Sequence, residues 1–299
     1  MRDRFINSLI GEAESNENLM LIVGDLGYGV IEEFEKRFPN QFINAGVAEQ
    51  NMIGMAAGLA KMGYKVFVYS IANFPTFRCL EQIRNDIAYH NLDVSIVAIG
   101  AGFSYGTLGY SHHAVEDLAI MRSIPGLKIY SPCDPNKVEE CFIDSLKTNG
   151  PKYFRLGKNG EPEIKNMAPI FDNSILDQTS NKLIISTGAI TSEAYSAKAK
   201  LKLKGIQIDV LAVNIIKPFH LKKDQIKKYD QIYVLEEHSI IGGLGSCVIE
   251  ELQAMEISIP VKLIAIPDNV EHLTGSQTFL RKHFGLDAET IANLIEESL

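Results

Sequence analysis

Short apolar runs alternate with stretches of helical spacing in the first half of the chain. The runs are rich in Val and Ile, which is typical of strands that are buried on both faces. They cover residues 19–24, 65–71, 94–100 and 128–131. Because strands and helices alternate, we expect a parallel sheet with helices on both faces.

Three helices are predicted between these strands. One begins at Glu49 and continues through small and apolar residues as EQNMIGMAAGLAKMG, and a second lies around residues 79–90. The third starts at Asp134-Pro135, where Asp is a favoured N-cap and Pro a favoured first helical residue. These helices would cover the predicted sheet.

The pattern breaks after Gly157. Residues 161–180 are polar and contain Pro162, Pro169 and several Asn, so they are predicted to form a linker. This linker would separate a domain of residues 1–160 from a domain of residues 181–299.

The second domain repeats the alternation of strands and helices. Strands are predicted at residues 183–187, 207–214 and 231–237, and the last is followed by the glycine turn GGLGS and a helix. Asp287 is a predicted N-cap of the closing helix. The sequence therefore predicts an α/β protein of two domains, each with a mostly parallel sheet flanked by helices.

Composition narrows the partners and the compartment. A length of 299 residues suits two domains of about 150 residues, and the net charge of -8 argues against nucleic acid or an anionic membrane as partner. No apolar run approaches the ~20 residues of a membrane span, and no signal peptide is apparent. Four cysteines without CxxC spacing indicate reduced, mostly buried thiols of a cytoplasmic protein and no metal site.

Glu49 is the first candidate site residue, because a carboxylate begins an otherwise small and apolar helix. The helix dipole favours a glutamate in the first turn, which is a purely structural explanation. Gly46 and Ala48 leave room for a ligand, however, and burial disfavours the charged form of a carboxylate. Such a group is suited to sharing a proton with a weak base.

Two other groups of side chains are candidates. His112 and His113 follow the glycine-bearing loop 102–110, and at most one of two adjacent histidines is expected to face a site. The structural alternative is a hydrogen-bonded loop histidine. Phe74 and Phe77 either pack in the core, which is usual for phenylalanine, or form a platform for a flat ring.

Taken in this order, these features resemble the thiamine-diphosphate enzymes of the transketolase family. The likeness is strongest to the C-terminal subunit of split transketolases, with deoxyxylulose-phosphate synthase as a relative. FINAGVAEQNMIGMAAGLAKMGYKVFV resembles the family's pyrimidine-binding domain, and SHHAVEDLAIMRSIPGLKIYSPCDP resembles its THQxxEDxAxMRxIP segment. KYDQIYVLEEHSIIGGLGSCVIEEL resembles the family's C-terminal domain, so the likeness covers nearly the whole chain.

The resemblance implies a role for each candidate. Glu49 would hydrogen-bond a ring nitrogen of the cofactor's aminopyrimidine and so activate the cofactor. Phe74 and Phe77 would stack on the pyrimidine, and His112 would contact substrate oxygens, which makes Glu49 and His112 the expected catalytic residues. The reaction would be transfer of a two-carbon ketol unit between sugar-type substrates, with thiamine diphosphate as electron sink.

The family's magnesium and diphosphate site is expected to lie on another chain. Members hold both groups with a GDG…N pattern, whereas here Leu26 follows Gly24-Asp25 and Asn51 falls inside a predicted helix. The resemblance thus implies a partner subunit that carries magnesium and diphosphate, with the active site at the subunit interface. Because family members pair through their pyrimidine domains, we expect an assembly with two copies of each subunit.

Several positions depart from the family pattern. Gly100 stands where transketolases have a substrate-binding histidine, and Leu108 where they have an aspartate that contacts a sugar hydroxyl. Gly29 aligns with a serine that contributes to phosphate binding. Lys158 aligns with the phosphate-binding arginine, and Arg155 is close by, so both are expected to bind substrate. These departures suggest an altered substrate, such as a larger or non-phosphorylated acceptor.

Two alternatives stay open at the level of sequence. Beta subunits of 2-oxoacid dehydrogenases share both domains and the AEQ motif. A non-catalytic subunit could also keep the fold and the partner surface, although retention of a buried Glu49 speaks against it.

Overall fold

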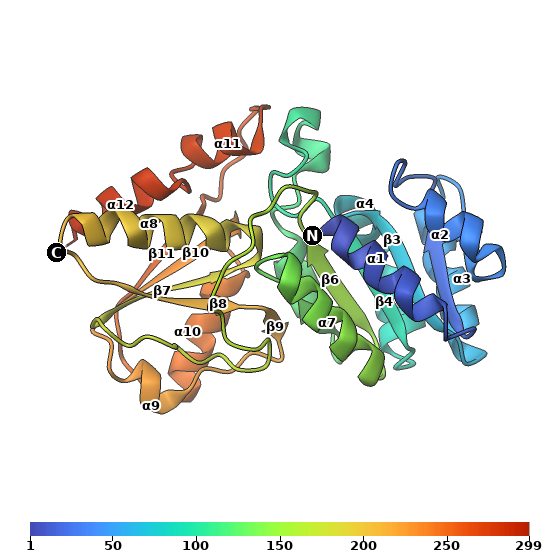
Figure 1. The fold of residues 1–299 in the computed structure, drawn as a ribbon, viewed down its shortest axis with the longest axis horizontal. Coiled ribbons are helices and arrows are strands. Elements are labelled where there is room, and N and C mark those ends of the chain that lie inside the picture. The colour runs from blue at the N-terminus through green and yellow to red at the C-terminus, as the bar shows by residue number, and fades with distance from the viewer. Residues whose placement is uncertain (299) are drawn as a thin grey trace.

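A seven-stranded sheet forms the centre of the N-terminal half in the computed structural model, which describes residues 1–298 (Figure 1). The strand order is β2-β1-β3-β4-β6-β5-β9, and every neighbouring pair is parallel except β5 and β9. The strands are β1 (Leu19–Val23), β2 (Phe42–Asn44), β3 (Lys65–Ile71), β4 (Val94–Ile99), β5 (Lys128–Tyr130), β6 (Lys152–Leu156) and β9 (Ile215–Lys217).

Helices cover both faces of this sheet. On one face, α1 (Arg2–Ala13) and α7 (Pro135–Lys147) meet through the rings of Phe5 and Phe142, whose centroids lie 5.5 Å apart. On the other face, α3 (Glu49–Lys61) packs its buried side chains against β1 and β3. The shorter helices are α2 (Glu32–Arg37), η1 (Pro39–Gln41), α4 (Asn73–Arg78), α5 (Leu80–Gln82), η2 (Ile83–Ala88), η3 (Gly106–Leu108), η4 (Tyr110–His112) and α6 (Asp117–Arg122).

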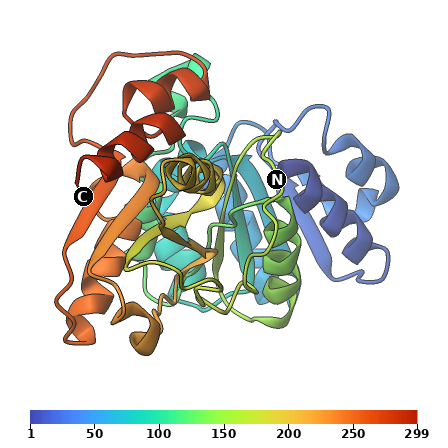
Figure 2. The same ribbon diagram turned by 60° about the vertical axis from the view of Figure 1, so that its left-hand side comes forward.

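The C-terminal half has a four-stranded parallel sheet of order β11-β10-β7-β8. Helices α8 and α12 lie on one face and α10 lies on the other (Figures 1 and 2). The elements are β7 (Lys182–Thr187), η5 (Gly188–Ile190), α8 (Thr191–Leu203), β8 (Asp209–Val213), α9 (Lys223–Ile226), β10 (Gln231–Ser239), α10 (Leu244–Ala254), β11 (Val261–Ile266), α11 (Gln277–His283) and α12 (Ala288–Glu296).

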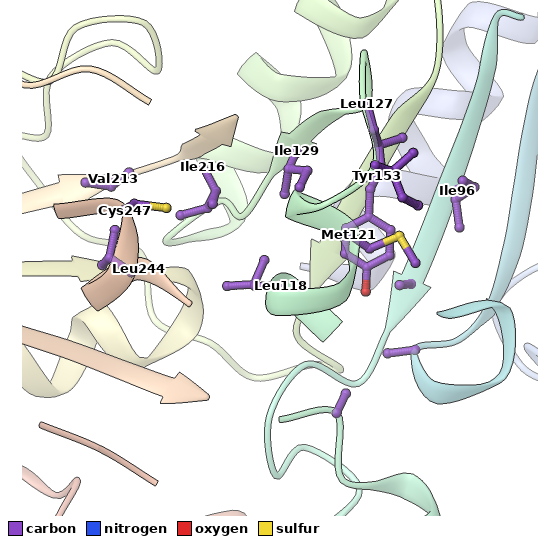
Figure 3. Close-up of a cluster of buried hydrophobic side chains, with 14 of the residues drawn as sticks. Ile96, Leu118, Met121, Leu127, Ile129, Tyr153, Val213, Ile216, Leu244 and Cys247 are labelled. Atoms are coloured by element: carbon purple, nitrogen blue, oxygen red, sulfur yellow. The ribbon is translucent and has the colours of Figure 1, made fainter. Parts of the chain in front are cut away.

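The two halves share structure across their boundary. After β8, the chain crosses over and adds β9 antiparallel to β5 at the edge of the first sheet. One hydrophobic cluster also spans the boundary (Figure 3). In it Leu118 and Met121 of α6 lie between the first sheet and Leu244 of α10. The relative position of the two sheets is therefore fixed by a common core.

The predicted fold class is confirmed, since both sheets are mostly parallel and flanked by helices. Asp134 and Asp287 are N-caps as predicted, and each accepts backbone hydrogen bonds in the first turn of its helix. No helix or strand lies between β6 and β7, within the described residues. The prediction of one helix at residues 79–90 is wrong in detail, because α5 is short and runs into the π-helix η2.

All four cysteines are free and buried, as predicted. Burial raises the pKa of Cys79, Cys133 and Cys247 to about 12, so these thiols are poor nucleophiles. Among residues 1–298, no helix has the length and apolar character needed to cross a membrane.

Candidate active site

The candidate residues gather at the carboxyl edge of the first sheet. Glu49 follows β2, Phe74 follows β3, His112 follows β4 and Lys158 follows β6. In open α/β sheets, ligands bind in the crevice outside the carboxyl ends of the strands. The topology thus brings together side chains that are far apart in the sequence.

Glu49 is the first residue of α3 and is 5% exposed. Its side chain lies beside Gly24, at the end of β1, where a Cβ would be 3.9 Å from Cγ of Glu49. Oε1 of Glu49 accepts a hydrogen bond of 3.1 Å from Nη1 of Arg78. The result is a carboxylate largely removed from solvent with a single cationic partner.

Arg78 also covers the ring of Phe74. The guanidinium carbon lies 4.2 Å from the ring centroid, which is within the range of a cation–π contact. Both residues belong to α4, at the four-residue spacing that brings helical side chains together. One planar group therefore stacks on Phe74 and donates to Glu49 at the same time. Arg78 is not among the residues predicted from the sequence, although this spacing from Phe74 was a signal that could have found it.

Phe77 lies on the same short helix and is 45% exposed. With Phe74, Arg78 and Tyr110 it lines a cleft of about 400 Å³. Neither Glu49 nor His112 lines this cleft. The two phenylalanines thus border this cleft, and Phe74 additionally faces His112.

His112 ends η4 and faces Phe74, with the two ring centroids 5.4 Å apart in a T-shaped arrangement. Its Nδ1 lies 3.0 Å from Oγ of Ser111. Burial, followed by the nearby His113 and Arg78, lowers the pKa of His112. The imidazole is therefore neutral near pH 7 and can both donate and accept a hydrogen bond.

His113 points into the protein instead. It is 5% exposed, and its Nε2 lies 3.1 Å from the carbonyl oxygen of Gly106. Asn73 at the start of α4 donates to the carbonyl oxygens of Ser111 and His113 at 3.0 and 2.9 Å. These bonds hold the histidine loop against α4. His112 faces the ring of Phe74, while His113 is among the residues that line the cleft beside Phe77.

Arg155 lies in the interior between the two sheets. It is 3% exposed, its Nε donates to the Asp117 carboxylate at 2.9 Å, and its Nη2 donates to the carbonyl oxygens of Ala114 and Glu237. These hydrogen bonds occupy the guanidinium and join β6 to α6 and β10. Arg155 therefore connects elements of the interior, whereas the sequence led us to expect a contact with substrate.

Lys158 lies just beyond β6 and is exposed, with its Nζ 5.0 Å from the ring centroid of Tyr105. Tyr105 also faces His112 in a T-shaped contact with the centroids 6.4 Å apart. Burial raises the pKa of Tyr105, so its hydroxyl stays protonated. Tyr105 is a second residue of this region that the sequence alone did not indicate.

At three positions, a glycine or leucine stands where the family pattern has a polar residue, and the surroundings of the three differ. Gly29 has a positive φ of 78° with no atom within 4 Å of a built Cβ, and its backbone N–H donates to Glu32. Leu108 is 54% exposed. Gly100 is covered by the ring of Tyr105.

The Gly24-Asp25 stretch does not build a metal site with Asn51. Asp25 accepts hydrogen bonds from Asn44 and Tyr28, while the Asn51 amide points along α3 to Met55. No group of three or more potential ligands among His, Cys, Asp and Glu is placed to hold a metal ion in the described part of the chain.

The site thus combines a buried carboxylate, an aromatic face and a neutral histidine, in a chain of two α/β domains. Family profiles match both halves of the chain. Residues 1–161 match the transketolase pyrimidine-binding domain, and residues 174–291 match the transketolase C-terminal domain.

Individual relatives have the same extent as this chain. It is 36% identical to an apulose-4-phosphate transketolase subunit of Phocaeicola vulgatus, over 97% of this chain and 94% of that protein. It is 39% identical to a putative transketolase C-terminal section of Methanocaldococcus jannaschii, over 100% and 96% of the two chains. A solved split-gene transketolase, described as an inactive beta4 tetramer, superposes with a TM-score of 0.86 at 31% identity, covering 99% and 96%.

The chain therefore belongs to the transketolase family. It is a transketolase-type transferase subunit that carries the pyrimidine-binding and C-terminal domains.

Proposed function

We propose that this chain supplies the pyrimidine-binding half of a thiamine-diphosphate site, shared with a partner subunit, that transfers a ketol unit between sugar-type substrates. The observation that carries the proposal is Glu49, a carboxylate 5% exposed at the start of α3 and joined by Arg78 to the face of Phe74. Family membership supports thiamine diphosphate as the cofactor.

The residues present fit the aminopyrimidine half of the cofactor. That ring is flat and carries nitrogens, so it can stack on Phe74 and hydrogen-bond Glu49. The guanidinium of Arg78, also flat and nitrogen-bearing, makes both contacts in this structure. We infer that Arg78 moves aside when the cofactor binds. Phe77 would extend the aromatic surface, although its exposure makes its contribution smaller.

Each side chain has a distinct chemical task in this proposal. Thiamine diphosphate, when bound, supplies the electron sink for breaking and forming the carbon–carbon bond next to a ketone. Glu49 holds a proton at the pyrimidine nitrogen that it contacts. His112, neutral and close to Phe74, exchanges hydrogen bonds with substrate oxygens. Lys158 provides a positive charge for an anionic group of the substrate.

The diphosphate and magnesium are assigned to the partner subunit. Support comes from Asp25 and Asn51, whose side chains do not converge, and from the subunit organisation named for the relative in Phocaeicola vulgatus. Binding of thiamine diphosphate by the isolated chain should therefore be weak.

Self-association of this chain is assigned to the exposed face of α3. Gly54 and Gly58 are exposed there with no atom within 4 Å of a built Cβ, and Val47 and Met62, which flank the two ends of α3, are 75% and 76% exposed. Small residues allow close approach of a second helix, and the apolar neighbours would be buried by it. The tetramer described for the split-gene relative supports pairing of such subunits.

The substitution Glu49→Gln tests the proposal. It removes the carboxyl proton but keeps the size of the side chain, so the complex with the partner subunit should form normally. Ketol transfer should be abolished, and so should hydrogen–deuterium exchange at the reactive carbon of the cofactor, followed by NMR. Glu35→Gln, at an exposed position of α2, is the matched control and should behave like the wild type.

Two results would contradict the proposal. Undiminished exchange in Glu49→Gln would remove Glu49 from the mechanism. Tight magnesium-dependent binding of the cofactor by the isolated chain would contradict the shared site. Decarboxylation of a 2-oxoacid without ketol transfer would instead favour the 2-oxoacid dehydrogenase alternative.

A further inference from the structure

Gly100 and Tyr105 fit together at the carboxyl end of β4. A Cβ built at Gly100 would lie 2.3 Å from Cδ2 and 2.4 Å from Cε2 of the Tyr105 ring. No real side chain tolerates such distances, and the φ of Gly100, +97°, also disfavours any other residue. The tyrosine ring thus fills the space that a side chain at position 100 would occupy.

The filled space lies within the proposed site. The Tyr105 ring faces His112 at 6.4 Å, and His112 in turn faces Phe74 at 5.4 Å. Tyr105 also lies 5.0 Å from Nζ of Lys158. Contacts between neighbouring side chains therefore link Phe74 to His112, His112 to Tyr105, and Tyr105 to the exposed ammonium group.

The loop that carries Tyr105 is held at several points. The N–H of Phe103 donates to Oε1 of Glu237 at 2.9 Å, and the N–H of Gly275 donates to the carbonyl oxygen of Gly106 at 3.2 Å. Oγ of Ser104 donates to the carbonyl oxygen of Ala101 at 2.8 Å. Because the residues on both sides of Tyr105 are held by these hydrogen bonds, the backbone of the loop fixes where the Tyr105 side chain begins.

We propose that Tyr105 is a specificity-determining residue: its ring borders the bound substrate beside His112 and positions Lys158 for the anionic end of the substrate. The proposal rests on the proposed function, since it assigns a substrate contact within that site. Lysine is a flexible point charge without the fixed fork of arginine, so a neighbouring aromatic face restricts where its ammonium group lies.

The test uses two substitutions in the reconstituted complex. Tyr105→Leu removes the aromatic face, and Tyr105→Phe keeps it. D-Fructose 6-phosphate and D-fructose serve as matched probes, and KM and kcat are measured for each as donor. A cation–π contact at an exposed site corresponds to about a two- to fivefold change in affinity. Tyr105→Leu should therefore raise KM for the phosphorylated probe about two- to fivefold relative to the neutral one, and Tyr105→Phe should not.

A double-mutant cycle separates positioning of Lys158 from a general disturbance of the site. If Tyr105 acts through Lys158, Tyr105→Leu should have little further effect on the phosphate preference in a Lys158→Ala background. Additive effects, or an unchanged preference in Tyr105→Leu, would overturn the proposal. Tyr89→Leu, at a tyrosine 83% exposed beyond η2, is the control and should match the wild type.

A second measurement does not depend on turnover. Lysines of the complex are reductively methylated with 13C, and the Lys158 signal is assigned by its loss in Lys158→Ala. The Tyr105 ring current should shift this signal in the wild type and in Tyr105→Phe, and Tyr105→Leu should abolish the shift. A Lys158 signal unaffected by Tyr105→Leu would overturn the positioning role. Absence of ketol transfer in the wild-type complex would contradict the proposed function instead.

Discussion

Arg78 connects the two polar side chains of the site at the scale of single residues. Its guanidinium donates to Glu49, and its positive charge is one of the three causes that lower the pKa of His112, after burial and His113. A lowered pKa means that the imidazole stays neutral to a lower pH than a free histidine does. The contact with Glu49 and the effect on His112 thus depend on the same half-exposed side chain.

The substitution Arg78→Ala should raise the pKa of His112 toward its ordinary value of 6.5, because a nearby positive charge is removed. Protonation of His112 in the chain without cofactor would then begin at higher pH. The shift is measured by NMR titration of the His112 ring protons, assigned with His112→Gln.

Arg84→Ala is the control for this titration, since Arg84 is exposed and its Nη1 bonds the side chain of Asn85. It should leave the titration of His112 unchanged. A His112 pKa that stays the same or falls in Arg78→Ala would show that the charge of Arg78 does not act on the imidazole.

Sequence reasoning reached some of these residues and missed others for a physical reason. The burial of Glu49 was predictable, because the helix that it begins consists mostly of small and apolar residues. Tyr105 carried no comparable signal. Its significance comes from a glycine five residues earlier and from a lysine just beyond β6, and only the folded loop brings these together.

The loop between β4 and α6 is the element that positions the site, and the C-terminal half of the chain holds it in place. Glu237 of β10 is 3% exposed and accepts hydrogen bonds from the N–H of Phe103 and from Arg281 of α11. Figure 1 shows α11 beside this part of the chain. The C-terminal domain therefore contributes to the site by supporting the loop that carries His112.

The substitution Arg281→Ala should lower the free energy of unfolding by about 3 kcal/mol, because it leaves a buried carboxylate without its cation. Nε and Nη2 of Arg281 both donate to Oε2 of Glu237, at 3.0 and 2.6 Å, and the two side chains are 11% and 4% exposed. Chemical denaturation of the chain measures this change.

Arg4→Ala gives the comparison for an exposed ion pair, as the Arg4 side chain is 39% exposed and contacts Glu139 and Glu163. Exposed pairs contribute about 0–1 kcal/mol, so the effect should be small. An Arg281→Ala variant as stable as Arg4→Ala would mean that Glu237 finds other partners in place of Arg281.

The elements themselves were only partly predictable. Strands β1, β3, β4 and β10 were recognised because they are apolar runs. Strand β6 was missed because Lys152 and Arg155 interrupt its pattern. Both charges are nevertheless buried, since Lys152 pairs with Asp93 and Arg155 with Asp117. Strand β9 has three residues and depends on a long-range antiparallel pairing with β5.

At the scale of the whole molecule, the two domains are in direct contact and share a hydrophobic core. Arg155 of β6 donates to the carbonyl oxygen of Glu237 in β10, and the hydrophobic cluster in Figure 3 extends across the same boundary. The polar segment after β6 indicated a boundary in the sequence. The shared core was not predictable, because hydrophobic periodicity shows that a face is buried but not which partner covers it.

The last prediction concerns the exposed face of α3, which we propose as the contact between two copies of this chain. Gly54→Arg should abolish self-association and leave the single chain folded. A side chain at position 54 meets no atom within 4 Å, and replacing a helical glycine removes a residue of low helix propensity. Between two closely packed copies, the same arginine would clash and place a charge in an apolar contact.

Gly11→Arg provides a matched control, because Gly11 also lies within a helix, is exposed and has nothing within 4 Å of a built Cβ. The oligomeric state of both variants is measured by sedimentation velocity, and their folding by circular dichroism. Dissociation in Gly54→Arg alone would locate the contact on α3. Equal assembly of the two variants would place the contact elsewhere than on α3. If the cofactor site lies at the α3 contact, Gly54→Arg should lose activity together with assembly.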